Sequence, residues 1–209
     1  MERKRILNMT CIVGYIDKKN DTVWMGSDSM GSNGYTHELF SVPKVFRQDV
    51  FKNVIMGVCG SYRSMDLLRY SESLFPELDW YKKKDEINHK YMVKTFIPNV
   101  IKLLQENQPD ENETSRGCNF LVGVKNQLFE IQNDYSVLTP IHNFASVGSG
   151  EVAAIGSLIT TNRLYGDKMK PENHILHALR AATEYCMGVG APYHLINTKE
   201  EDKIYTFDE

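Results

Sequence analysis

Cysteine pairs are missing from this sequence. Its four cysteines, Cys11, Cys59, Cys118 and Cys186, lie far apart and form no CxxC motif. Structural zinc sites use closely spaced cysteine pairs, and disulfide-stabilised secreted domains have a denser supply of cysteine. The spacing therefore excludes both classes, and it predicts reduced, buried thiols in a cytoplasmic protein.

Long hydrophobic runs are also missing. No segment reaches the roughly 18 uninterrupted apolar residues of a membrane-spanning helix. Residues 1–8, MERKRILN, place basic residues before a short apolar stretch, but Asn8, Thr10 and Asp17 interrupt that stretch. It is too short for the hydrophobic segment of a signal peptide. We therefore expect a soluble protein that is not exported and has no membrane partner.

A surplus of positive charge is absent as well. The formal net charge is −3, and the sequence has no basic stripe with interleaved aromatic residues, so we expect no nucleic-acid partner. Hydrophobic residues make up 42% and charged residues 24% of the 209 residues, which is typical of a globular domain. No segment has the composition of a linker. We predict one domain over residues 10–209, preceded by an N-terminal extension or propeptide at residues 1–9.

The order of the predicted elements indicates the fold class. Strands come first, followed by two helices, more strands, two more helices and a final hairpin. This order lacks the β-α-β alternation of a parallel sheet and fits two antiparallel sheets packed face to face, with a helix pair outside each. We therefore predict an α+β fold, a four-layer αββα sandwich. The predicted strands lie at 10–16, 22–28, 37–46, 53–60, 118–124, 127–133, 135–141 and 144–148, the helices at 61–75, 88–107, 151–166 and 171–188, and the hairpin at 193–208.

Thr10 follows Met9 directly and opens the first predicted strand. A threonine hydroxyl in the middle of a chain is a poor nucleophile, and most such threonines only favour a strand. If the Met9–Thr10 bond is cleaved, the new α-amine, with a reference pKa of about 7.7 to 8.0, lies beside Oγ1 and can act as its base. Thr10 would then supply both the nucleophile and the base.

Such a pair needs a cation near the amine, a carboxylate that orients the cation and an N–H donor for the oxyanion. Asp28 ends the strand that pairs with the strand of Thr10, Lys44 lies in the next extended segment, Gly60 ends the fourth strand, and Ser149 precedes a helix. Each also has an ordinary explanation, as a turn acid, an edge-strand charge, a loop joint or a helix N-cap. Only their combination indicates a catalytic site.

Five short motifs, taken in order, resemble those of the N-terminal-nucleophile hydrolases, specifically the proteasome β-subunit and the bacterial HslV peptidase. No single motif is specific, but their order and spacing match across most of the domain. The motifs are Thr10-Cys11-Ile12-Val13, Gly26-Ser27-Asp28, Lys44-Val45, Gly57-Val58-Cys59-Gly60 and Gly148-Ser149-Gly150-Glu151 with Ala154.

The resemblance implies an αββα threonine endopeptidase that needs no metal or organic cofactor. It also implies peptide or unfolded-protein substrates, a homo-oligomeric ring and, as one option, an ATP-dependent unfoldase partner. The implied roles are Thr10 as nucleophile with its amine as base, Lys44 as the cation that lowers the hydroxyl pKa, Asp28 as its orienting partner, Ser149 as a supporting hydrogen-bond group, Gly60 as the oxyanion hole, and Val58 as a pocket wall that favours hydrophobic substrate residues.

The sequence departs from the family pattern in two places. Residues 183–190, TEYCMGVG, lack the usual aspartate and serine, so Glu184 either replaces the aspartate or belongs to a plain helix end. Eight residues also precede Met9. Three explanations stay open: residues 1–9 are removed from a precursor, translation starts at Met9 and methionine removal exposes Thr10, or the site is silent.

Two other functions remain open. The chain could be a catalytically silent structural ring subunit, although the combination of Thr10, Asp28 and Lys44 speaks against that interpretation. It could also be a non-peptidase amidohydrolase of the same superfamily. A free Thr10 amine would favour an enzyme over a silent subunit, and a screen of small-molecule amides would identify an amidohydrolase.

Overall fold

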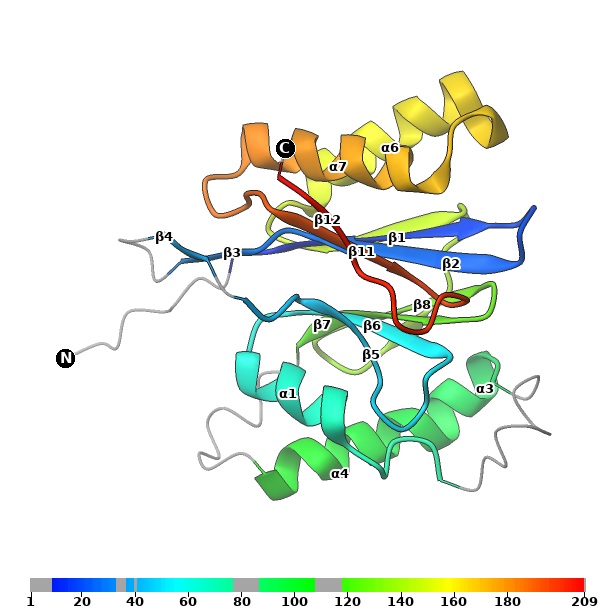
Figure 1. The fold of residues 1–209 in the computed structure, drawn as a ribbon. Helices are drawn as coiled ribbons and strands as arrows, with labels where there is room; N and C mark the ends of the chain where they lie inside the picture. The colour runs from blue at the N-terminus through cyan, green and yellow to red at the C-terminus, as the bar shows by residue number, and fades with distance from the viewer. Residues whose placement is uncertain (1–8, 33–36, 40, 77–86, 108–117, 209) are drawn as a thin grey trace.

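Two antiparallel sheets lie face to face between two layers of helices (Figure 1). The computed structural model describes residues 9–32, 37–39, 41–76, 87–107 and 118–208. Both sheets have five strands. The predicted four-layer αββα sandwich is thus confirmed. No helix in these ranges is long and apolar enough to cross a membrane.

The first sheet has the strand order β10-β1-β2-β11-β12. Strands β1 and β2 form a hairpin in this sheet. In the turn between them, Asp17 Oδ1 accepts hydrogen bonds from Lys19 N and Asn20 N, and Asp21 adopts a φ of 50°. The predicted C-terminal hairpin is confirmed as β11 and β12. The strands are β1 (Cys11–Asp17), β2 (Thr22–Ser27), β10 (Phe144–Gly148), β11 (Tyr193–Asn197) and β12 (Tyr205–Phe207).

The second sheet has the order β5-β6-β7-β8-β9. A tight turn at Lys125-Asn126 joins β7 to β8, and Lys125 has a φ of 53° there. A small separate hairpin pairs β3 with β4. The strands are β3 (Met30–Ser32), β4 (His37–Leu39), β5 (Val45–Arg47), β6 (Val54–Cys59), β7 (Asn119–Val124), β8 (Gln127–Ile131) and β9 (Val137–Leu138).

Each sheet carries its own layer of helices on its outer face (Figure 1). Ser61 caps α1, because its Oγ accepts a hydrogen bond from Ser64 N at 3.2 Å. The second sheet is covered by α1 (Tyr62–Tyr70), α3 (His89–Tyr91), a π-helical segment (Met92–Phe96) and α4 (Ile97–Asn107), and the first sheet by α6 (Glu151–Tyr165), a 3₁₀ turn (Gly166–Lys168) and α7 (Pro171–Tyr185).

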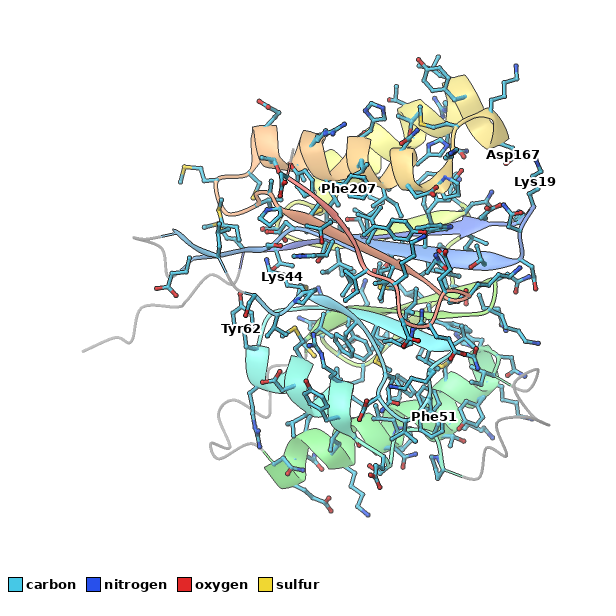
Figure 2. All side chains as sticks on the ribbon, in the orientation of Figure 1. Lys19, Lys44, Phe51, Tyr62, Asp167 and Phe207 are labelled. Atoms are coloured by element: carbon cyan, nitrogen blue, oxygen red, sulfur yellow. The ribbon has the colours of Figure 1, made fainter. Side chains whose placement is uncertain are left out.

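Apolar side chains fill the space between the two sheets and between each sheet and its helices (Figure 2). Side chains of β1 point alternately to the two faces, so that Ile12 packs toward the second sheet and Val13 toward α6 and α7. The sheets approach closely at Gly57, where an added Cβ would lie 2.4 Å from Cγ2 of Ile12. This close packing fixes the position of β1, and therefore of Thr10.

Several predicted elements are wrong in extent. The strand predicted at 135–141 is only β9, Val137–Leu138, and the helix predicted at 171–188 ends at Tyr185. The segment 37–46 is not one strand, because β4 and β5 belong to different sheets. The first helix ends at Tyr70 rather than at residue 75, since Ser71 leaves the helical conformation with a ψ of 130°. There the Ser71 carbonyl accepts a hydrogen bond from the Gln48 side chain.

Pro98 does not interrupt the predicted helix at 88–107. A proline ring clashes with the carbonyl four residues earlier, which is that of Lys94. Lys94 lies in the wider π-helical turn, in which Ile97 N donates to the Met92 carbonyl. The charged segment 82–86, whose composition indicates a solvated loop or a helix start, and the polar segment 108–117, whose composition indicates a loop, lie outside the described residues.

Candidate active site

Thr10 lies immediately before β1 and is 4% exposed. Its nitrogen, here in the peptide bond to Met9, donates to Ser149 Oγ at 3.1 Å. The Ser149 hydroxyl donates in turn to the Thr10 carbonyl at 3.3 Å, and Gly150 N donates to the same carbonyl at 3.3 Å. The segment that follows β10 therefore holds both polar groups of the Thr10 backbone.

The Gly-Ser-Gly sequence permits this close approach. Gly148 has a φ of +107°, and an added Cβ would lie 2.2 Å from the Thr10 carbonyl oxygen. A Cβ on Gly150 would lie 2.8 Å from Cβ of Cys11. The N-cap residue of α6 is Gly150, with no side-chain cap bond, so the alternative of Ser149 as an N-cap is wrong. Its side chain faces Thr10 instead.

Asp28 and Lys44 form a buried ion pair between the sheets. Lys44 Nζ lies 2.9 Å and 3.0 Å from the two Asp28 oxygens, and the side chains are 3% and 0% exposed. Lys44 also donates to the Met30 carbonyl at 2.6 Å. Asp28 follows β2 and Lys44 precedes β5, so the pair joins the two sheets, and Lys44 lies between the sheets in Figure 2 and lines the same pocket as Thr10.

Asp28 also binds the strand that carries Thr10. Its Oδ1 accepts from Cys11 N at 3.0 Å, and its Oδ2 accepts from Met30 N at 3.1 Å and from Gly190 N at 3.5 Å. Burial raises the pKa of the Asp28 carboxyl above its usual value, whereas Lys44 and the backbone donors act in the opposite direction. This carboxylate positions the lysine and the start of β1 together.

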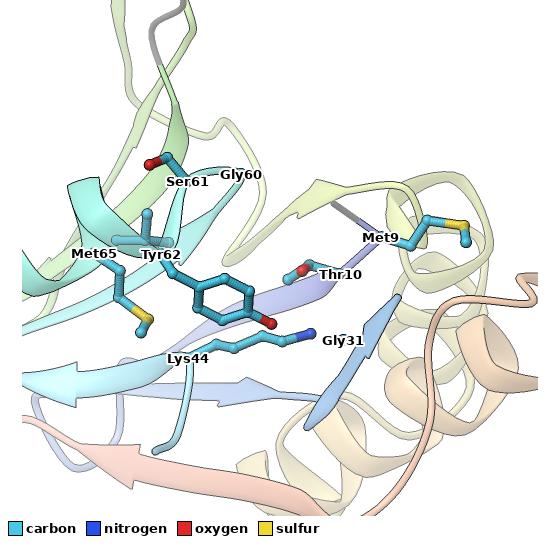
Figure 3. Close-up of a pocket in the computed structure, with 9 residues that line it drawn as sticks. Met9, Thr10, Gly31, Lys44, Gly60, Ser61, Tyr62 and Met65 are labelled. Carbon is cyan, nitrogen blue, oxygen red and sulfur yellow. The ribbon is translucent and has the colours of Figure 1, made fainter. Parts of the chain in front are cut away.

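A pocket opens beside Thr10 (Figure 3). Its wall contains the predicted Val58, which is 3% exposed, and the predicted Gly60, which has a φ of +110° between β6 and α1. Tyr62 and Met65 were not predicted here, although they lie within the first turn after the Ser61 cap. The lining residues are Met9, Thr10, Gly31, Lys44, Val58, Gly60, Ser61, Tyr62 and Met65.

The segment after α7 forms another border of the site. Gly190 contacts Asp28 through its N–H, and an added Cβ on Gly188 would lie 2.1 Å from Cβ of Met9. Cys186 Sγ donates to Ser149 Oγ at 3.5 Å. Glu184 is exposed on α7. Residues 183–190 depart from the family pattern in sequence. In the structure, Gly188, Gly190 and Cys186, rather than Glu184, make this segment's contacts with the site.

The two histidines of α7, His174 and His177, differ in burial and contacts. His174 is buried, its Nε2 donates to the Gly166 carbonyl at 3.1 Å, and its Nδ1 lies 2.9 Å from Thr161 Oγ1. Its ring stacks on Tyr15 with centroids 4.7 Å apart, and burial lowers its pKa. His177 is exposed. Within the described ranges, no three His, Cys, Asp or Glu side chains are grouped to hold a metal ion.

No protein-family model matches the chain, and no curated protein matches it by sequence. Solved structures match its fold. Eukaryotic HslV from Trypanosoma brucei is 20% identical with a TM-score of 0.64, and the match covers 90% of this chain and 98% of that one. BPH of Thiobacillus denitrificans in complex with epoxomicin is 14% identical with a TM-score of 0.65, covering 90% and 97%. The chain thus has the N-terminal-nucleophile hydrolase fold of HslV and BPH.

Proposed function

We propose that this chain is a threonine peptidase that hydrolyses peptide bonds with Thr10 once its α-amine is free. One observation carries the proposal: Lys44, held by the buried Asp28, lines the same pocket as Thr10, and Asp28 accepts a hydrogen bond from the N–H of Cys11, the next residue. Burying an ion pair costs free energy, because both charges lose their contact with water. Its position next to a hydroxyl in a pocket favours a catalytic role.

The reaction begins with proton transfer from Thr10 Oγ1 to the α-amine. Oγ1 attacks the substrate carbonyl, and the Gly60 N–H is the proposed donor to the oxyanion. The ammonium then protonates the departing amine as the C–N bond breaks and an ester forms. Water, deprotonated by the amine, hydrolyses the ester and restores Thr10. The positive charge of Lys44 lowers the pKa of the Thr10 hydroxyl, while Asp28 holds the lysine in place.

The α-amine must be released before this chemistry can occur. Removal of residues 1–9 or methionine removal from a chain started at Met9 would each produce a free Thr10. Ser149 Oγ already lies 3.1 Å from the Thr10 nitrogen, so it would contact the amine after cleavage. Release of Met9 would also vacate the space against Gly188.

The pocket supports an apolar preference for the substrate residue before the cleaved bond. Val58 and Met65 are buried in its wall, and Tyr62 extends across it toward Lys44 (Figure 3). Peptides or unfolded proteins would reach Thr10 more readily than folded ones, because Thr10 is only 4% exposed.

Ring assembly is part of this proposal, with an ATP-dependent unfoldase as one optional partner. Exposed apolar side chains near the ends of α6 and α7 support an interface with neighbouring subunits. Val152 is 79%, Tyr185 81% and Met187 83% exposed. Large exposed apolar groups are frequent at protein–protein contacts.

The test begins with the N-terminus. The protein is expressed from Met1 and, separately, from Met9, and its intact mass and N-terminal sequence are determined. Preparations with a free Thr10 are incubated with fluorogenic peptides and with epoxomicin, the compound bound to BPH. We expect hydrolysis and a covalent mass increase, both absent in Thr10→Ala. Equal hydrolysis by Thr10→Ala would contradict the mechanism.

A silent ring subunit remains the second candidate, because the Thr10 nitrogen is in a peptide bond to Met9 in the full chain. If Met9 stays attached in both preparations, no amine is available and this second function is favoured.

A further inference from the structure

We propose that Cys186 is a positioning residue for the Thr10 nitrogen, acting through the hydroxyl of Ser149. The inference rests on the proposed function of Thr10 and extends it to a residue outside the pocket. Cys186 lies just beyond the end of α7, where its backbone N–H donates to the Ala182 carbonyl at 2.8 Å. That bond fixes the backbone from which the thiol extends.

Three hydrogen bonds meet at Ser149 Oγ. Cys186 Sγ donates to it at 3.5 Å, Thr10 N donates to it at 3.1 Å, and the Ser149 hydroxyl donates to the Thr10 carbonyl at 3.3 Å. A serine hydroxyl has one hydrogen to donate and two lone pairs to accept with. The thiol and the Thr10 nitrogen therefore use both lone pairs, and the hydroxyl hydrogen is directed to the carbonyl.

This arrangement determines which way the free amine faces. A neutral amine has two N–H groups and one lone pair. If Ser149 accepts one N–H, the lone pair stays available for the proton of Thr10 Oγ1. Without the thiol donor, the Ser149 hydroxyl can rotate and donate to the amine lone pair, which would occupy the base. Cys186 thus keeps Ser149 an acceptor.

Among the residues that the structure describes, titratable or charged side chains from several elements lie around Thr10 and its hydrogen-bond partners. Burial raises the pKa of Cys11 to about 12, so its thiol carries no charge near neutral pH, and burial also raises the pKa of Glu151 above its usual value. The titratable and charged groups are Cys11 on β1, Asp28 after β2, Lys44 before β5, Tyr62 on α1, Glu151 on α6 and Cys186 after α7.

The first arm of the test uses the full chain, with Met9 attached, and needs no activity. Protein labelled with ¹⁵N-threonine is prepared as wild type, Cys186→Ala, Cys186→Ser and the control Cys118→Ala. Cys118 is buried against the helices of the other layer. We expect exchange of the Thr10 amide to rise about fivefold in Cys186→Ala, the worth of one ordinary hydrogen bond, and to stay near the wild-type rate in the other variants.

The amides of Thr22 and Thr183 report general loosening. Thr22 lies in β2 and Thr183 in α7. An unchanged Thr10 rate in Cys186→Ala, or an equal rise at Thr22 and Thr183, would overturn the proposal.

The second arm uses the form with a free Thr10 amine. We expect kcat to fall about fivefold in Cys186→Ala, and the acid limb of the pH profile to move to lower pH, because a hydroxyl that donates to the amine stabilises its neutral form. Cys186→Ser should restore both. An unshifted limb in Cys186→Ala would contradict the proposal. If wild type hydrolyses nothing, the proposed function fails, while the amide exchange still decides the role of Cys186.

Discussion

The two sides of Thr10 differ in depth and in chemistry. On one side, Asp28 and Lys44 are 0% and 3% exposed, and their ion pair joins the two sheets. On the other side, Ser149 is exposed and Cys186 is half-buried, and both lie in glycine-rich connections beside α6 and α7. Burial strengthens an electrostatic interaction and makes the loss of one partner costly. The first side should therefore control both stability and chemistry, and the second chiefly the chemistry.

Lys44→Ala should show the largest effect, because it leaves Asp28 as a buried, uncompensated carboxylate. We expect a loss of about 3–5 kcal/mol in the free energy of unfolding, the range for a broken buried pair, together with loss of peptide hydrolysis. Denaturant unfolding and a peptide assay check both. The control is Lys52→Ala, since Lys52 and its partner Asp49 are 51% and 59% exposed; it should change stability by less than about 1 kcal/mol.

If Lys44→Ala unfolds at the same denaturant concentration as wild type, the buried side has no special structural role. The difference between the two sides would then have to be explained by chemistry alone.

Ser149→Ala should reverse this pattern. The side chain is exposed, so we expect the free energy of unfolding to change by about 1 kcal/mol or less. Hydrolysis should fall roughly tenfold, because the Thr10 amine loses its 3.1 Å contact with Ser149 Oγ. The kcat and unfolding midpoint are measured on the same preparation. A large loss of stability with normal kcat would show that the exposed side is structural after all.

The buried side was also the easier one to predict. Asp28 follows the strand that forms a hairpin with β1, so the antiparallel register alone brings it to the start of that strand. The order of the extended segments also predicts that Lys44 lies next to Asp28. The predicted strand 37–46, which contains Lys44, is nevertheless two strands, β4 and β5, in different sheets. Local patterns show which residues are extended, but they do not show which sheet each strand joins.

The exposed side depends on contacts that no local pattern contains. Cys186 and Ser149 are 37 residues apart and meet only because α6 and α7 return to the same end of the first sheet. Tyr62 and Met65 reach the pocket because α1 begins right after Gly60. The position of the Gly60 turn was predictable, whereas the direction of the side chains that follow it depends on packing against the second sheet.

Thiol alkylation sharpens the comparison on the exposed side. Burial raises the pKa of Cys11 and Cys59 to about 12 and that of Cys118 to about 11, so these thiols should react slowly. N-ethylmaleimide should then add once, at Cys186, forming an S–C bond and removing the S–H donor. We expect hydrolysis to fall about fivefold, and peptide mapping locates the adduct.

Cys186→Ser should resist this inactivation. Equal inactivation of that variant, with the adduct on another cysteine, would show that access to the buried thiols is greater than their packing indicates.

The smallest expected effect is a pH dependence of the free energy of unfolding that comes from His174, in the helix layer on the first sheet. Burial lowers the pKa of His174, which bonds Gly166 and Thr161 and stacks on Tyr15. In the unfolded chain its pKa is near 6.5, so as the pH falls below about 6.5 the unfolded state binds the proton first and the free energy of unfolding decreases.

His174→Gln should be less stable near pH 7.5 and should lose this part of the acid dependence. Denaturant unfolding at pH 7.5 and 5.5 measures both effects, and an unchanged slope in His174→Gln would assign the acid sensitivity to other groups. Because His174 joins α7 to Thr161 and Gly166 at the end of the helix pair away from Ser149 and Cys186, this loss of stability should leave both the Ser149–Cys186 contact and the Asp28–Lys44 pair in place.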